Sequence, residues 1–221
     1  MKLQIVFATG NQDKVREIRE ILNDPELTVV SMKEAGISAD PDENGTTFAE
    51  NALIKARAAA ELLFSSPIQA PLDPSLPVVV LSDDSGLVVD ALGGEPGIYS
   101  ARYLGRDTSY SEKMGHILKE LEGQTGAARS ARFVCSCAAV FPNSAADDKV
   151  ASLDELVVTE TMEGEIADSI RGEHGFGYDP FFYLPELGKT SAELTDDEKN
   201  AISHRGKAVR AMLEKLRGYS L

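Results

Sequence analysis

The stretch VVVLSDDSGLVVDAL, residues 78–92, decides how this chain folds. It begins with a β-branched run from Val78 to Leu81, in which consecutive residues are apolar, as is typical of a strand buried on both faces. A second apolar run extends from Leu87 to Leu92, and the polar residues Asp83 to Gly86 separate the two runs. We therefore predict two buried strands with a polar interruption between them.

The interruption Asp83-Asp84-Ser85-Gly86 is the first candidate for chemistry. Two adjacent carboxylates in an otherwise buried stretch are energetically costly unless they are paired or bound to a metal. Their hard oxygen atoms suit Mg²⁺, which typically takes one or two carboxylates and shares the phosphates of a substrate. The alternative is a hairpin turn of the Asp-Ser-Gly type, although such a turn does not need two acids in tandem.

Before this stretch, strand and helix patterns alternate. Residues from Leu3 to Ala8 are predicted to form a buried strand, and helical periodicity follows from Lys14 to Leu22. The acidic, glycine-containing stretch from Lys33 to Thr46 is predicted to be a loop. Thr47 and Glu50 form a capping-box pattern at the start of an alanine-rich helix that extends to about Leu63. That pattern also explains Glu50 without any functional role.

After the acidic stretch, the pattern remains mixed. Residues from Ser111 to Leu121 have the spacing of an amphipathic helix. Arg132 to Phe141 and Glu155 to Met162 are predicted to be antiparallel strands around a polar loop. Thr195 begins a second capping box, and helix is expected to about Arg217. Strands and helices mixed throughout predict an α/β class with a mixed sheet, in a single domain over residues 1–221.

Composition narrows the function classes. The chain has 221 residues, 43% of them hydrophobic, and a formal net charge of −14. A surface with this much negative charge repels the phosphate backbones of nucleic acids, and general nucleic-acid binding is therefore not expected. A local cleft can still bind a small phosphorylated ligand. The absence of a signal-peptide pattern and of an apolar run of about 20 residues indicates no membrane association. Cys135 and Cys137 are expected to be buried thiols, which suits a cytoplasmic protein.

Three features are candidates for binding phosphate or metal. Residues from Thr9 to Lys14 join a strand to a helix, where backbone N–H groups, the helix dipole and a lysine charge favour an anion. No Walker pattern is present, so a plain strand-to-helix turn is the alternative. Lys55 on the alanine-rich helix is either a phosphate ligand or a surface lysine. Glu43 in the acidic loop either completes a metal site or is solvated.

Two further features are candidates for binding a base. In Phe176-Gly177-Tyr178-Asp179, two aromatic residues flank a glycine in a loop predicted to be exposed. A ring there can stack on a purine, and Asp179 can accept a hydrogen bond from a base N–H; a β-turn with a hydrophobic anchor is the alternative. Lys199, His204 and Arg205 cannot share one face of a straight helix. Either the helix breaks near Ile202 or these side chains reach different parts of one ligand.

Taken in order, these motifs resemble those of a known family. The matching segments are FATGN with Lys14, FAENA with Lys55, DDSGL at 83–87, GG at 93–94 with PGIYSAR at 96–102, FGYDP at 176–180 and SHR at 203–205. The chain resembles the inosine triphosphate pyrophosphatase family over nearly its whole length. The resemblance implies a Mg²⁺-dependent homodimer that hydrolyses dITP, ITP and XTP to the monophosphate and pyrophosphate and so removes them from the nucleotide pool. It also implies a long mixed sheet with flanking helices and two lobes around a central substrate cleft.

Roles for single residues follow from the same resemblance. It implies that Asp84 is the catalytic acid and a metal ligand, and that Glu43 is a second metal ligand. Whether Asp84 acts as general base, as ligand or as both stays open. The substrate contacts that it implies are Thr9, Gly10, Asn11, Gln12, Asp13, Lys14, Lys55, Ser85, Phe176, Gly177, Tyr178, Asp179, Lys199, His204 and Arg205. A phosphatase or nucleotidyl transferase, and a nucleotide-binding module without catalysis, are the rival interpretations.

Overall fold

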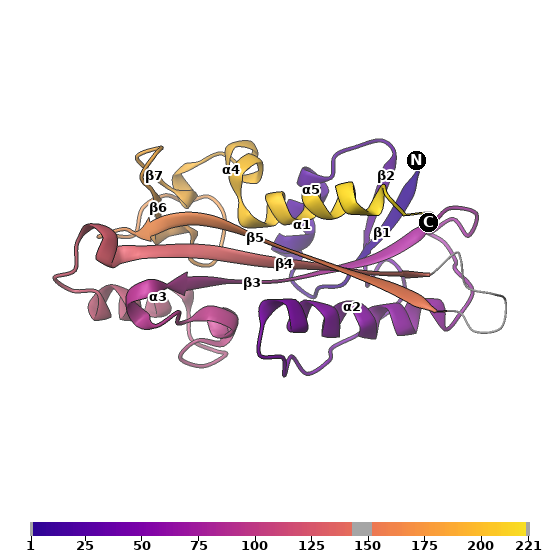
Figure 1. Ribbon diagram of the computed structural model, residues 1–221, viewed down its shortest axis with the longest axis horizontal. Helices are drawn as coiled ribbons and strands as arrows, with labels where there is room; N and C mark the ends of the chain where they lie inside the picture. Colours follow the sequence, from indigo (N-terminus) through magenta and orange to yellow (C-terminus); the bar gives the residue numbers. More distant parts are fainter. Residues whose placement is uncertain (1, 143–151, 220–221) are drawn as a thin grey trace. The chain divides into compact units, whose positions relative to one another are not determined.

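The computed structural model describes residues 2–142 and 152–219. Its strands form a seven-stranded sheet in the order β2-β1-β3-β4-β5-β6-β7 (Figure 1). β1 pairs in parallel with β2 and with β3, whereas β6 pairs antiparallel with β5 and with β7, so the predicted mixed sheet is confirmed. The strands are β1 (Leu3–Phe7), β2 (Leu27–Ser31), β3 (Val78–Val89), β4 (Ser130–Pro142), β5 (Leu153–Ile166), β6 (Phe182–Leu184) and β7 (Lys189–Thr190).

Helices lie where the sequence pattern predicts them. The α-helices among the described residues are α1 (Gln12–Ile21), α2 (Phe48–Phe64), α3 (Tyr110–Glu120), α4 (Asp196–Ile202) and α5 (His204–Leu216). Short 3₁₀ helices occupy Asp90–Leu92, Gly97–Arg102, Gly126–Arg129, Asp179–Phe181 and Ser191–Glu193. α4 begins with the predicted capping box, in which Thr195 and Glu198 each accept a hydrogen bond from the other's backbone N–H.

The described residues fall into two compact units. Unit 1 takes its residues from 1–84, 136–159 and 205–221, and unit 2 from 85–135 and 160–204. The chain passes from one unit to the other within β3, β4 and β5 and after His204, the first residue of α5. Each unit has its own hydrophobic core and is described separately below.

In unit 1, the core lies between the strands and the alanine face of α2. Ala52, Ala56, Ala59 and Ala60 follow helical spacing and are fully buried. Their small side chains allow α2 to pack closely on apolar strand residues such as Val80. Figure 1 shows α2 on one side of β3, and α1 and α5 on the other. Side chains on the two faces of β3 therefore meet different helices.

In unit 2, α3 covers a core rich in large side chains. Met114, Ile117 and Leu121 pack with aromatic residues of β4 and β6, including Phe133 and Phe182. The rings of these two phenylalanines lie 4.5 Å apart. This core supports the loop that carries residues 172–179, because Tyr178 belongs to it.

One prediction about the acidic stretch is wrong. Asp83 to Gly86 do not separate two strands, because β3 runs without interruption from Val78 to Val89. The carboxylates are tolerated inside a buried strand because cationic side chains pair with both of them. A continuous strand has a direct consequence: successive side chains alternate between faces, so Asp83 and Asp84 point in opposite directions.

Other expectations are confirmed. The backbone leaves the helical region at Ser203, with φ −64° and ψ 151°, so the last helix breaks directly after Ile202. Cys135 and Cys137 are both fully buried in β4. The polar loop expected between β4 and β5 falls mainly on 143–151, outside the described residues.

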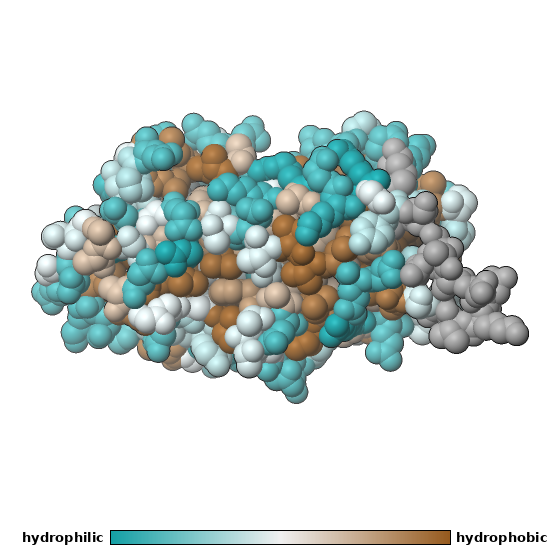
Figure 2. Space-filling model, viewed as in Figure 1, coloured by the Kyte–Doolittle hydropathy of each residue, from teal (hydrophilic) through white to brown (hydrophobic). Residues whose placement is uncertain are grey.

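On the face shown in Figure 2, hydrophilic residues predominate and hydrophobic residues occupy smaller areas between them. Within the described part of the chain, no helix combines the length and the apolar character needed to cross a membrane.

Candidate active site

In the turn between β1 and α1, side chains of the turn itself accept hydrogen bonds from some of its backbone N–H groups. Asn11 caps α1, and its Oδ1 accepts hydrogen bonds from the backbone N–H groups of Asp13 (2.9 Å) and Lys14 (3.3 Å). Thr9 Oγ1 accepts from the N–H of Asn11 at 3.2 Å. Some of the amides that the sequence suggested for binding an anion are therefore already bonded. Gly10 is exposed, and a Cβ atom there would meet nothing within 4 Å, so the turn stays open to close approach.

On one face of β3, Asp83 is enclosed by cations. Its Oδ1 lies 2.9 Å from Nζ of Lys14, and its Oδ2 accepts from Nε and Nη2 of Arg205, each at 3.1 Å. Arg205 also forms an ion pair with Glu17 of α1. The side chain of Asp83 is 0% exposed. This network joins β3 to α1 and α5 within unit 1.

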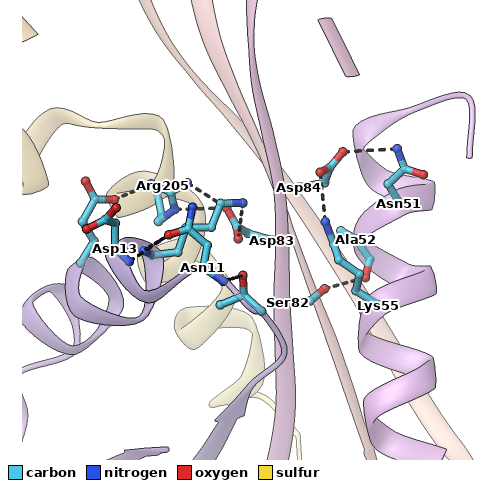
Figure 3. Close-up of polar contacts among 12 residues, drawn as sticks. Asn11, Asp13, Asn51, Ala52, Lys55, Ser82, Asp83, Asp84 and Arg205 are labelled. Carbon is cyan, nitrogen blue, oxygen red and sulfur yellow. Dashed lines mark hydrogen bonds and ion pairs between the residues drawn. The ribbon is translucent and has the colours of Figure 1, made fainter. Parts of the chain in front are cut away.

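On the opposite face, Asp84 is held by two side chains of α2. Lys55 Nζ lies 3.0 Å from Asp84 Oδ1, and Asn51 Nδ2 donates to Oδ2 at 3.4 Å. Asn51 and Lys55 are four residues apart, so both face β3 from one side of the helix. Figure 3 shows Asp83 and Asp84 pointing to opposite sides of the strand, with Asn51 and Lys55 beside Asp84. The Asp84 side chain is 11% exposed, whereas that of Asp83 is fully closed off.

The loop before α2 brings a second carboxylate to the same place. Glu43 Oε2 lies 3.2 Å from Nζ of Lys55. The N–H of Gly45 donates to Asn51 Oδ1 at 2.9 Å, and a Cβ atom on Gly45 would lie 2.7 Å from that oxygen. Glycine at position 45 therefore lets the loop lie close against α2, and Asn51 contacts both the loop and Asp84.

Glu50 has a different environment. Its carboxylate accepts from the backbone N–H and the hydroxyl of Thr46, at 2.6 and 2.8 Å. Thr47 caps the helix as predicted by accepting from the N–H of Glu50, but the reciprocal bond goes to Thr46 instead of Thr47. Hydrogen bonds from Thr46 hold the pKa of Glu50 below its usual value. Glu50 therefore organises the start of α2.

Charge and burial act against each other at Asp84 and Lys55. Burial is the largest influence on Asp84 and raises its pKa, although Lys55 and Lys14 oppose that shift. Burial on its own would lower the pKa of Lys55, but the surrounding carboxylates, Asp84 first among them, raise it above its usual value. Lys55 therefore remains a protonated ammonium between two carboxylates.

The carboxylates of Asp84 and Glu43 suit a divalent cation. Within residues 2–142 and 152–219, no group of three or more histidine, cysteine, aspartate or glutamate side chains is arranged to hold a metal. Two carboxylates nevertheless converge on one point, because oxygens of both contact the same Lys55 ammonium. Two protein carboxylates are enough for Mg²⁺, which takes its other ligands from water and phosphates.

In unit 2, the loop at residues 172–179 is fixed by a buried ion pair. Asp179 Oδ2 accepts from Lys199 Nζ at 2.7 Å and from the backbone N–H of Phe176 at 2.9 Å. Lys199 Nζ also lies 5.1 Å from the centre of the Phe176 ring. A Cβ atom on Gly175, which has φ +73°, would lie 2.3 Å from Asp179 Oδ2. Asp179 and Lys199, both predicted to contact substrate, are thus bonded to each other.

The exposure predicted for the second aromatic residue of this loop is wrong. Tyr178 is only 3% exposed, its ring packs edge-on against Tyr110 at 5.1 Å, and its hydroxyl donates to the carbonyl of Ser100 at 3.0 Å. Burial raises its pKa. The ring is a core anchor, which was the alternative interpretation of this motif. Phe176 is half-buried, and His204 is buried with its ring stacked on Phe133 at 4.8 Å.

Comparison with known proteins shows the family to which the chain belongs. The family model described as the Ham1 family matches residues 5–215. The chain belongs to the Ham1 family. A dITP/XTP pyrophosphatase of Yersinia pseudotuberculosis is 46% identical, with 97% of this chain and 98% of that protein covered. One of Geobacillus kaustophilus is 44% identical, with 96% and 93% covered. A solved HAM1 protein from Coxiella burnetii is 40% identical, with a TM-score of 0.75 and 98% and 99% of the chains covered.

The Ham1-family chain also has site residues that the sequence analysis did not single out. Asn51 and Glu17 are both buried and both contact a residue of the candidate site. A usable signal existed in each case: Asn51 lies one turn before Lys55, and Glu17 lies three residues after Lys14, so each shares a helix face with a predicted lysine. Arg205 was predicted to contact the nucleotide, but its guanidinium is held by Asp83 and Glu17.

Proposed function

We propose that this Ham1-family chain hydrolyses dITP, ITP and XTP to the nucleoside monophosphate and pyrophosphate, and so removes these nucleotides from the pool. The observation that carries the proposal is the convergence of Asp84 and Glu43 on the Lys55 ammonium in unit 1. Carboxylates and lysines at one place are what cleavage of a polyphosphate needs. The names of the relatives from Yersinia pseudotuberculosis and Geobacillus kaustophilus support the choice of substrates.

The turn before α1 and the residues around Asp84 would bind the triphosphate. Lys14 and Lys55 supply positive charge, and the turn from Thr9 to Asp13 supplies polar groups at the start of α1. Both lysine side chains are only 15% exposed, so their charges act in a partly desolvated place where electrostatic interactions are stronger. Ser85, the next residue of β3, is proposed as a further substrate contact.

Asp84 and Glu43 would hold the metal, for which Mg²⁺ is the proposed ion. When bound, it neutralises phosphate charge that an acidic protein would otherwise repel. Asp84 orients a water molecule toward the α-phosphorus. The water oxygen forms a bond to that phosphorus and releases a proton to the solvent, the bond to the bridging oxygen of the β-phosphate breaks, and pyrophosphate leaves, stabilised by Lys14 and Lys55.

The loop at residues 172–179 and the start of α5 would recognise the base. Hypoxanthine and xanthine present an acceptor at O6 and a donor at N1–H, whereas adenine reverses both. We propose that Phe176 stacks on the base and that His204 donates to O6, with a group of the Gly177 to Asp179 segment accepting from N1–H. A site that pairs these groups rejects the reversed pattern, because it would leave buried polar groups unpaired. Lys199 and Arg205 remain proposed nucleotide contacts in addition to their ion pairs.

The assembly and the location belong to the same proposal. We propose a homodimer, which the family resemblance implies, and a cytoplasmic location, which is supported by the two buried thiols, Cys135 and Cys137, because they suit a reducing compartment. Analytical ultracentrifugation tests the dimer directly: sedimentation at the mass of one chain would rule it out.

A product assay tests the activity. The purified chain is incubated with ITP, dITP, XTP, GTP, ATP or dATP, with and without Mg²⁺, and pyrophosphate and phosphate are quantified separately. We expect pyrophosphate and monophosphate in equal amounts from ITP, dITP and XTP with Mg²⁺, and turnover of dATP at least about 100-fold slower than that of dITP. Release of phosphate alone would indicate the rival phosphatase, and binding without turnover would indicate a nucleotide-binding module.

A further inference from the structure

The ammonium of Lys55 lies between the carboxylates of Asp84 and Glu43, in the position that a divalent cation bound to both carboxylates would take. Its Nζ is 3.0 Å from Asp84 Oδ1 and 3.2 Å from Glu43 Oε2, so one ammonium bridges the two carboxylates that are proposed to bind the metal. We propose that Lys55 acts as an exchangeable counter-ion: it holds the metal-binding carboxylates together in the metal-free protein, and a divalent cation must displace it. This inference rests on the metal site in the proposed function.

The contacts of the ammonium support exchange. A Mg²⁺ ion contacts carboxylate oxygens at about 2.1 Å, and an ammonium left on the same two oxygens would face a double positive charge at very short range. The two cations therefore compete for the same oxygens. Without either cation, two carboxylates would face each other in a partly buried place and repel.

The surroundings show that the carboxylates do not depend on Lys55 alone for their positions. Asn51 donates to Asp84 Oδ2, the oxygen that Lys55 does not contact, and accepts from the N–H of Gly45 in the loop that carries Glu43. Asn51 is fully buried in α2. Its amide can keep the loop and Asp84 in place while the ammonium leaves.

Lys14 provides a matched comparison within the same unit. Its side chain is also 15% exposed and also pairs with one of the tandem aspartates, Asp83. Asp83 points to the other face of β3 and has Arg205 as a second cation, so Lys14 does not occupy the proposed metal position. Removing Lys14 takes away the same charge without freeing Asp84 or Glu43.

The experiment measures the Mn²⁺ dissociation constant by isothermal titration calorimetry on the full chain without nucleotide. We expect Lys55→Met and Lys55→Gln to bind Mn²⁺ about tenfold more tightly than the unmodified chain, because the competing charge is gone. Lys14→Met should tighten binding by no more than about threefold, and Asp84→Asn should abolish it. Thermal unfolding followed by circular dichroism confirms that each variant is folded.

Three results would overturn the inference. One is equal or weaker Mn²⁺ binding by both Lys55 variants. Another is an equal gain in Lys14→Met, which would reveal a general charge effect. The third is the absence of Mn²⁺ binding in the unmodified chain and in Lys55→Met alike. Pyrophosphate release from dITP by the unmodified chain tests the proposed function separately, so exchange at Lys55 can fail while that activity holds.

Discussion

Asp83 and Asp84 are neighbours in sequence and have the same side chain, but their surroundings differ. Asp83 is bonded to two cations, Lys14 and Arg205, and its side chain is 0% exposed. Asp84 has one cation, Lys55, and the amide of Asn51, and it shares that cation with Glu43. Cations enclose the first carboxylate, whereas the second stays partly exposed beside another carboxylate.

The difference separates a structural role from a chemical one. A buried carboxylate enclosed by cations fixes the elements that supply those cations, here α1 and α5, and leaves no place for a ligand. A carboxylate with fewer partners and some exposure can still accept a metal or orient water. The contrast supports the proposal that Asp84 has the catalytic and metal-binding role, whereas Asp83 is expected to act in stability.

The largest expected effect is on turnover, in Asp84→Asn. The variant keeps the shape of the side chain but loses the charge that the proposed metal and water need. We expect pyrophosphate release from dITP to fall by at least about 10³-fold. The measurement is a steady-state pyrophosphate assay at saturating Mg²⁺, with circular dichroism to confirm the fold. Turnover near that of the unmodified chain would remove Asp84 from the mechanism.

Asp83→Asn should act mainly on stability. It leaves Arg205, which is buried, and Lys14, which is partly buried, without their shared carboxylate. Removing one partner of a buried ion pair costs about 3–5 kcal/mol. We expect the free energy of unfolding, from urea titration, to fall by about that amount, and by clearly more than in Asp84→Asn. If Asp84→Asn were the less stable variant, the contrast between the two faces of β3 would be reversed.

The smallest expected effect comes from Asn51→Ala. The substitution removes a buried amide that contacts Asp84 and the N–H of Gly45. We expect the free energy of unfolding to fall by about 1–3 kcal/mol and turnover to fall by about tenfold as Asp84 and the Glu43 loop lose their common anchor. The control is Thr46→Ala. Thr46 lies in the same loop as Glu43, and the substitution removes the contact of its hydroxyl with Glu50 in α2. We expect this variant to change turnover by less than about twofold. Equal losses of turnover in Asn51→Ala and Thr46→Ala would show that Asn51 has no specific role in positioning Asp84 and the Glu43 loop.

Local patterns in the sequence predicted most of the framework. Alanine spacing and the Thr47 cap predicted α2, and β-branched runs predicted the buried strands. The spacing of Lys199, His204 and Arg205, which cannot share one helix face, allowed for the observed helix break. These features depend on neighbouring residues, through side-chain periodicity and capping, so they can be read without knowing the fold. Local patterns also made the tandem acids, Glu43 and Lys55 candidates, and the family resemblance then selected Asp84 over Asp83 and assigned Glu43 to the metal.

The tertiary structure decided which of these residues meet. Whether the acidic stretch was a turn or a strand could not be settled locally, because a buried carboxylate is tolerated only if distant cations reach it. Arg205, which pairs with Asp83, is 122 residues away in sequence, and Lys55, which pairs with Asp84, is 29 residues away. Once those partners extend β3 through the stretch, strand alternation sends the two aspartates to opposite faces. The sequence determined that two acids stand side by side, and packing decided that only one of them faces Glu43.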